Sequence, residues 1–87
     1  MPVPLKLPKA LRLAGWKVKI QDKERVEDPH VAILRGTEKW RFGLRDHQFM
    51  DPSPDPSLVP RDVLSEIERN WKWLCEEWNK KYAKNPV

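Results

Sequence analysis

Cysteine is nearly absent from this chain of 87 residues, since Cys75 is the only one. A single cysteine cannot close an internal disulfide, which excludes the disulfide-stapled scaffolds that are common among small secreted proteins. Histidine is also scarce, and both histidines lie far from Cys75 in the sequence, which argues against an ordinary zinc site. We accordingly predict a protein with no metal and no cofactor.

Long apolar runs are missing as well. No stretch approaches the ~20 apolar residues that a membrane-spanning helix needs. Residues 1–8 are too short and too rich in proline to be the apolar core of a signal peptide. We therefore expect a cytoplasmic protein that does not enter the membrane.

Apolar residues make up only 39% of the chain, against the ~45–50% typical of globular domains. The five tryptophans partly compensate, because each aromatic side chain can bury ~150–250 Å². The length is that of a single domain, which we place over residues 1–87. In so small a domain every large apolar side chain matters for stability.

Positive charge is concentrated in the N-terminal half of the chain. Residues 1–47 contain eleven Lys and Arg against six Asp and Glu, a balance of 11 − 6 = +5. Residues 48–87 contain six and seven, a balance of 6 − 7 = −1. This asymmetry is compatible with an anionic partner such as nucleic acid, although it does not require one.

Alternation of apolar and polar residues predicts an antiparallel meander over residues 16–50. The strands are expected at residues 16–20, 30–35 and 38–45, with a short final strand at 48–50 after a tight turn at 46–47. Between the second and third strands, Gly36 and Thr37 favour a type II′ hairpin turn. That turn pairs Arg35 with Glu38 and Ile33 with Trp40, and it gathers the apolar residues of both strands on one face.

The remaining segments complete an α+β fold, in which a meander of three or four strands packs against one long C-terminal helix. The helix is expected over residues 60–83, because Leu64, Ile67, Trp71, Leu74 and Trp78 recur at spacings of three and four. Residues 1–15 are predicted to form a short helix between Pro8 and Gly15, or an extended arm. Residues 51–59 form a proline-rich connector.

The outer face of the meander is the first candidate site. It is predicted to carry basic side chains from neighbouring strands, with a histidine at the rim: Lys17, Lys19, His30, Lys39, Arg41 and Arg45. If such a surface binds nucleic acid, it does so through the backbone more than through the bases. The alternative is that these charges only keep the sheet soluble, since antiparallel sheets routinely have a charged outer face.

Trp73 is the second candidate, because its helical angle separates it from the apolar stripe. An exposed tryptophan on a polar helix face often marks a contact surface, although a single exposed aromatic needs no special explanation. The third candidate is the run from Glu27 to His30, where two carboxylates adjoin a histidine. That run has no orienting third group and no nucleophile, so a loop with a rigid strand entry is the simpler interpretation.

The run from Asp28 to Gly36, the strand from Trp40 to Leu44 and the helix end from Leu74 to Trp78 resemble a family of small bacterial proteins of unknown function. The family has a Pro-Pro-His-x-His-Val strand entry, and the resemblance covers residues 22–80. Its members are often encoded in pairs that look like toxin–antitoxin modules, which implies a small companion protein. Pro29, His30, Leu74 and Trp78 match the family pattern, whereas Asp28, Ala32 and Ile33 replace its first proline, second histidine and valine.

Three hypotheses follow for function. The first is a non-catalytic interaction module whose basic sheet face contacts RNA or an acidic protein, with one half of a toxin–antitoxin-like pair as one form of it. The second is a small ribonuclease-type toxin that uses His30, with Arg41 or Arg45 as phosphate anchors. The third is a structural protein that dimerises through the helix around Trp73. The sequence leaves the oligomeric state open.

Overall fold

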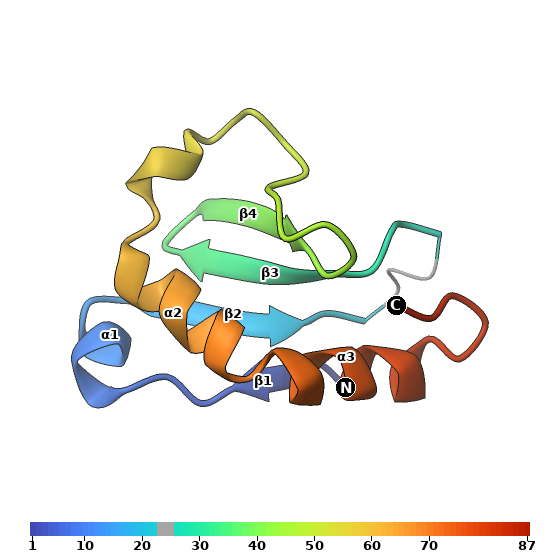
Figure 1. Cartoon of the computed structure of the whole chain (residues 1–87). Coiled ribbons are helices and arrows are strands. Elements are labelled where there is room, and N and C mark those ends of the chain that lie inside the picture. Colours follow the sequence, from blue (N-terminus) through green and yellow to red (C-terminus); the bar gives the residue numbers. More distant parts are fainter. Residues whose placement is uncertain (23–25) are drawn as a thin grey trace.

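The computed structural model describes residues 1–22 and 26–87 of the chain. It contains a four-stranded sheet whose one face is covered by two consecutive helices near the C-terminus (Figure 1). The elements, in chain order, are β1 (Val3–Leu5), α1 (Lys9–Leu13), β2 (Trp16–Ile20), β3 (His30–Arg35), β4 (Glu38–Gly43), a short 3₁₀ helix η1 (Pro56–Leu58), α2 (Arg61–Arg69) and α3 (Trp71–Lys81).

The sheet is an antiparallel meander with the strand order β1-β2-β3-β4, which confirms the predicted α+β fold. The predicted register between β3 and β4 is also confirmed, since Arg35 pairs with Glu38 and Ile33 with Trp40. At the turn, Gly36 has a φ of 59°, in the left-handed region that a type II′ turn requires at its first central position. The glycine therefore fixes which face of each strand is buried.

The fourth strand lies at the N-terminus, where we predicted a short helix or an extended arm. Val3–Leu5 forms β1 and pairs with β2, with Leu5 opposite Val18. The prolines around this strand argue against a strand in the sequence. Pro4 is nevertheless compatible with a strand at the edge of the sheet. Because proline cannot donate, the hydrogen-bonded pairs on this ladder are those of Val3 and Leu5, and the nitrogen of Pro4 faces away from the sheet.

The short helix predicted in this segment is also present as α1, at residues 9–13. Pro8 precedes it as the N-cap residue. Gly15 follows with a φ of 93°, the left-handed conformation that commonly ends a helix. The extended arm and the short helix were alternatives in the prediction from the sequence. In the structure, both are present, one after the other.

The predicted final strand at residues 48–50 is reduced to one isolated bridge between Phe42 and Phe49. The backbone of His47 is left-handed, with a φ of 57°, and β4 ends at Gly43 rather than at residue 45. Two hydrogen bonds still reach the outer edge of β4: the N–H of Gly43 donates to the carbonyl of Gln48 at 2.8 Å, and that of Met50 to the carbonyl of Arg41 at 2.9 Å.

The long C-terminal helix is interrupted at Asn70, which separates α2 from α3. The side-chain amide of Asn70 donates to the carbonyl of Glu66 at 2.8 Å, and its backbone has a φ of −108° and a ψ of 20°. Asparagine disturbs helices in this way because its side chain competes with the backbone for hydrogen bonds. The apolar stripe continues across the break, and its innermost members are fully buried: Val63, Ile67, Leu74 and Trp78.

The core lies between this stripe and the inner face of the sheet. The sheet contributes buried side chains from all four strands and from the segment after β4, among them Leu5, Trp16, Val18, Ile20, Val31, Ile33, Trp40, Phe42 and Leu44. Trp16, Trp40 and Trp78 are buried, and Trp71 is half-buried at the margin.

We predict that Leu74→Ala lowers the free energy of unfolding by about 2–5 kcal/mol, because it opens a cavity beneath a fully buried leucine. The matched control is Lys72→Ala on the exposed side of the same helix, expected to stay within about 0.5 kcal/mol of the parent. Urea unfolding followed by tryptophan fluorescence measures both. Equal losses in the two variants would contradict the packing described.

Candidate functional site

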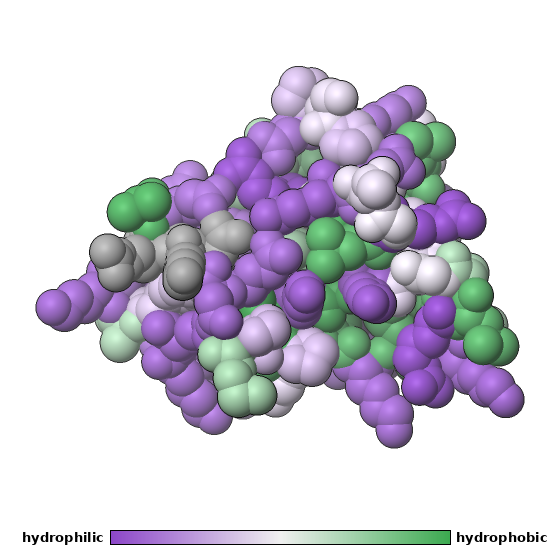
Figure 2. All heavy atoms as spheres, turned by 180° about the vertical axis from the view of Figure 1, so that it is seen from behind, coloured by the Kyte–Doolittle hydropathy of each residue, from purple (hydrophilic) through white to green (hydrophobic). Residues whose placement is uncertain are grey.

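The face of the sheet opposite the helices is mainly hydrophilic, with a smaller hydrophobic area near its centre (Figure 2). Lys17 and Lys19 of β2 lie on this open face, as predicted. The register places Lys17 in one row with Leu34 and Lys39, and Lys19 in the next row with Ala32 and Arg41. The sheet therefore brings together four of the basic residues singled out from the sequence.

Arg41, however, is held between two carboxylates. Its Nε donates to Oδ2 of Asp51 at 2.7 Å, its second terminal nitrogen donates to Oδ1 of the same residue, and its first donates to Glu27. The hydrogen bonds that Arg41 donates to Asp51 raise the pKa of Arg41 and lower the pKa of Asp51. Arg41 thus fastens two loops to β4, and its charge is compensated.

Arg45 is also engaged within the chain. Its guanidinium donates to the carbonyl of Pro86 at 2.7 Å and lies 3.6 Å from the carboxylate of Asp28. These contacts connect the end of the meander with the C-terminal segment. Arg45 therefore lies away from the rows that contain Lys17 and Lys19, although the sequence pattern grouped it with them.

His30 is buried, with 2% of its surface exposed. Its Nδ1 donates to the carbonyl of Asp28 at 2.8 Å, and its ring centroid lies 5.5 Å from that of Trp78. Burial is the main cause that lowers the pKa of His30 below its usual 6.5. The ring is consequently neutral near pH 7, and it is closed off from the open face on which we expected it.

A groove of about 600 Å³ runs beside Lys17 and Lys19 where the N-terminal segment leaves β2. Two further cations line it, Lys6 and Arg12, together with apolar residues of β1, β2 and the N-terminus: Met1, Pro2, Pro4, Leu5, Leu7, Trp16 and Val18. The strand pattern in the sequence did not single out Lys6 or Arg12. A signal was present, because residues 1–21 contain five Lys and Arg and no Asp or Glu.

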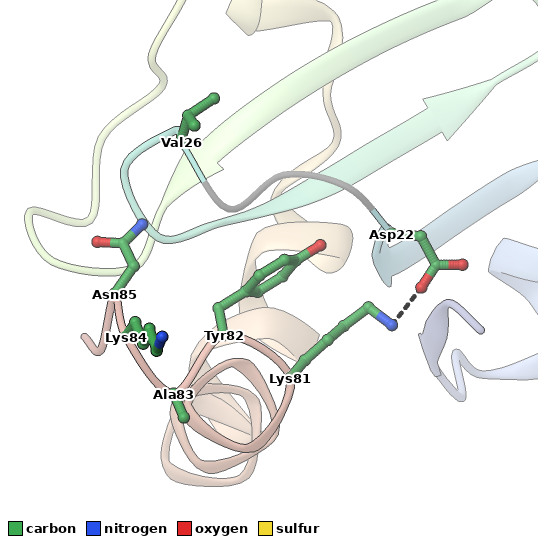
Figure 3. Close-up of a pocket in the computed structure, with 7 residues that line it drawn as sticks. All are labelled: Asp22, Val26, Lys81, Tyr82, Ala83, Lys84 and Asn85. Carbon is green, nitrogen blue, oxygen red and sulfur yellow. Dashed lines mark ion pairs between the residues drawn. The ribbon is translucent and has the colours of Figure 1, made fainter.

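A second pocket, of about 690 Å³, lies where the end of β2 meets the end of α3 (Figure 3). Its charged groups are largely paired: Lys81 forms an ion pair with Asp22, which also binds the terminal amine of Met1. The hydroxyl of Tyr82 donates to the carbonyl of Gln21. These contacts fasten the strand to the helix, so we read this pocket as a structural junction.

Trp73, the candidate contact residue of the helix, is 41% exposed. Its neighbour Trp71 is engaged instead with the turn after β4. The ring of His47 stacks on Trp71 with 3.7 Å between centroids, and its Nδ1 lies 3.0 Å from Oε1 of Glu68. The second histidine of the chain therefore connects the turn to both C-terminal helices.

The part of the chain that the structure describes contains neither a cluster of metal ligands nor a membrane-spanning helix. Within residues 1–22 and 26–87, no three His, Cys, Asp or Glu side chains gather as metal ligands would. No helix in the same ranges has the length and apolar character needed to cross a membrane. Comparisons with protein-family models, with curated proteins and with solved structures found no match, so the resemblance to a bacterial family stays a prediction.

We predict that His30 makes the protein less stable in mild acid. Because its pKa is lowered in the folded state, the unfolded state binds more protons at pH values below 6.5. Its contribution to stability is therefore complete above that pH and is lost as the pH falls towards the folded-state pKa.

The measurement is the free energy of unfolding across this pH range for the parent, His30→Gln and His47→Gln. In His30→Gln, the free energy of unfolding should fall less steeply as the pH is lowered. His47→Gln should keep the part of that fall that is due to His30. A decline of unchanged slope in His30→Gln would contradict the assignment.

Proposed function

We propose that this protein is a non-catalytic binding module that presents the open face of its sheet to an anionic partner. The observation that carries the proposal is the groove beside β2, which gathers the cations Lys6, Arg12, Lys17 and Lys19. None of their four side chains forms an ion pair or hydrogen bond within residues 1–22 and 26–87. Arg41 and Arg45, by contrast, are bound to carboxylates and carbonyls.

Elementary electrostatics supports this proposal. Lys17 and Lys19 point to the same side of one strand, about 6.6 Å apart, so their charges repel each other in the free protein. Clustered charge of one sign attracts a counter-charged partner and speeds its association. Among residues 1–22 and 26–87, no carboxylate side chain lines the groove, so the positive charge of these four side chains is not balanced by a lining group.

The competing hypotheses fit the geometry less well. A ribonuclease that uses His30 needs its imidazole within reach of the substrate, whereas this ring is enclosed beneath Trp78. Its suggested phosphate anchors, Arg41 and Arg45, already have partners within the chain. Pairing with a small companion protein and dimerisation around Trp73 stay predictions.

Charge reversal in the groove tests the proposal. We expect Lys17→Glu combined with Lys19→Glu to weaken binding of a labelled RNA of about 15 nucleotides at least tenfold at ~50 mM salt, and to reduce the salt dependence of affinity. The matched control reverses charge on the helical side, through Lys72→Glu with Lys84→Glu. Fluorescence anisotropy at several salt concentrations gives the affinities. Equal loss in both pairs, or no binding by the parent, would refute the proposal.

Arg41→Gln should separate structural cations from binding cations. The substitution leaves Asp51 and Glu27 without their partner, so we expect a loss of about 1–2 kcal/mol in the free energy of unfolding after allowance for solvent screening. Affinity for the same RNA should change less than threefold, because the charge removed is already compensated. Urea unfolding and anisotropy on one preparation make the comparison. Unchanged stability with strongly weakened binding would show that Arg41 belongs to the binding surface.

A further inference from the structure

We infer that the groove beside β2 accepts one nucleotide of a single-stranded nucleic acid, with its base between the apolar walls and its phosphates on the cationic rim. This inference rests on the proposed function and names the partner of the same site. The rim comprises Lys6, Arg12, Lys17 and Lys19. Three features of the groove lead to it: the free backbone at its floor, its size and lining, and its charge.

The floor of the groove contains backbone groups that can pair with a base. The ladder between β1 and β2 ends at Leu5 and Val18, after which the chain turns away into α1. Because Leu5 and Val18 form a hydrogen-bonded pair, alternation directs the N–H and C=O of Trp16 to the same side of β2. Outside the sheet ladders, no backbone hydrogen bond in residues 1–22 and 26–87 involves Trp16, which lines the groove with 4% of its surface exposed.

Size and lining suit one nucleotide. A volume of about 600 Å³ falls within the ~300–1,000 Å³ of small-ligand sites, which combine apolar walls with a few polar groups. The walls are built from Met1, Pro2 and Pro4 and from the aliphatic stems of the lysines, above the edges of buried residues. An apolar slot with a donor and an acceptor at its floor can hold the face of a base and pair with its edge.

Charge and accessibility select a single strand among polyanions. A duplex encloses its bases, and a simple polyphosphate has none, so either can use only the cationic rim. A single strand presents an unstacked base and its flanking phosphates together. An acidic peptide supplies negative charge without a planar group to enter the slot.

A competition experiment tests this inference with a labelled single-stranded RNA of about 15 nucleotides as the reference ligand. Its unlabelled competitors are the same RNA, the corresponding single-stranded DNA, the duplex, an abasic strand of equal phosphate number and poly-glutamate. We expect the two intact single strands to compete at least tenfold better than the abasic strand and the duplex. The RNA and DNA arms show whether the sugar matters.

A second readout follows the backbone of Trp16 directly. In a ¹⁵N-labelled protein, its amide signal should shift with the intact single strand and stay in place with the abasic strand at equal saturation. Lys6→Glu with Arg12→Glu should weaken all nucleic-acid competitors, whereas Lys72→Glu should weaken none.

Equal competition by the intact strand, the abasic strand and the duplex would overturn the inference and leave the proposed function intact. Poly-glutamate competing as well as the single strand would overturn it in favour of an acidic protein partner. Failure of the reference RNA to bind at all would remove both the inference and the proposed function.

Discussion

The burial of Trp78 is the interaction on which the rest of this structure depends. The fully buried ring contacts His30 at the entry of β3 and Tyr82 at the end of α3, with centroids 5.5 and 4.2 Å away. Its Nε1 donates to the carbonyl of Asn85 at 2.7 Å, and the side chain of Asn85 donates to the carbonyl of Glu27. One side chain thus joins helix, sheet and C-terminal segment. Since the helices cover the inner face of the sheet, its other face stays open.

Most of the fold was predicted from the spacing of apolar residues along the chain. The alternation in β2, β3 and β4, with a glycine at the hairpin, was sufficient for their pairing, because a one-residue slip would expose the apolar face. The apolar stripe of the C-terminal helices was also predicted from its spacing. The break at Asn70 was not predicted, because it depends on a hydrogen bond from the Asn70 side chain to one backbone carbonyl. β1 was missed because Pro4 conceals the alternation of Val3 and Leu5, and only pairing with β2 makes that segment a strand.

Residues of the site could be predicted only where the alternation of side chains along a strand determines their position. Lys17 and Lys19 lie on the open face because alternation within one strand places them there. The roles of Arg41 and His30 were not accessible in this way, since they depend on loops and a helix distant in sequence: Asp51 and Glu27 neutralise the arginine, and Trp78 encloses the histidine. The distribution of charge along the sequence shows where the cations are concentrated. Only the tertiary structure shows which of them form ion pairs with carboxylates.

Pro4 has a consequence for how this molecule can meet others. Sheets recruit additional strands through unpaired N–H and C=O groups at their borders, a route that leads to fibrils as readily as to specific complexes. Here one border presents a proline nitrogen without a hydrogen, and the opposite border already receives hydrogen bonds from the segment after His47. Lateral extension of the sheet is thereby obstructed on both sides. Partners are left to approach through the flat of the sheet or the outside of the helices, where side chains rather than backbone decide what binds.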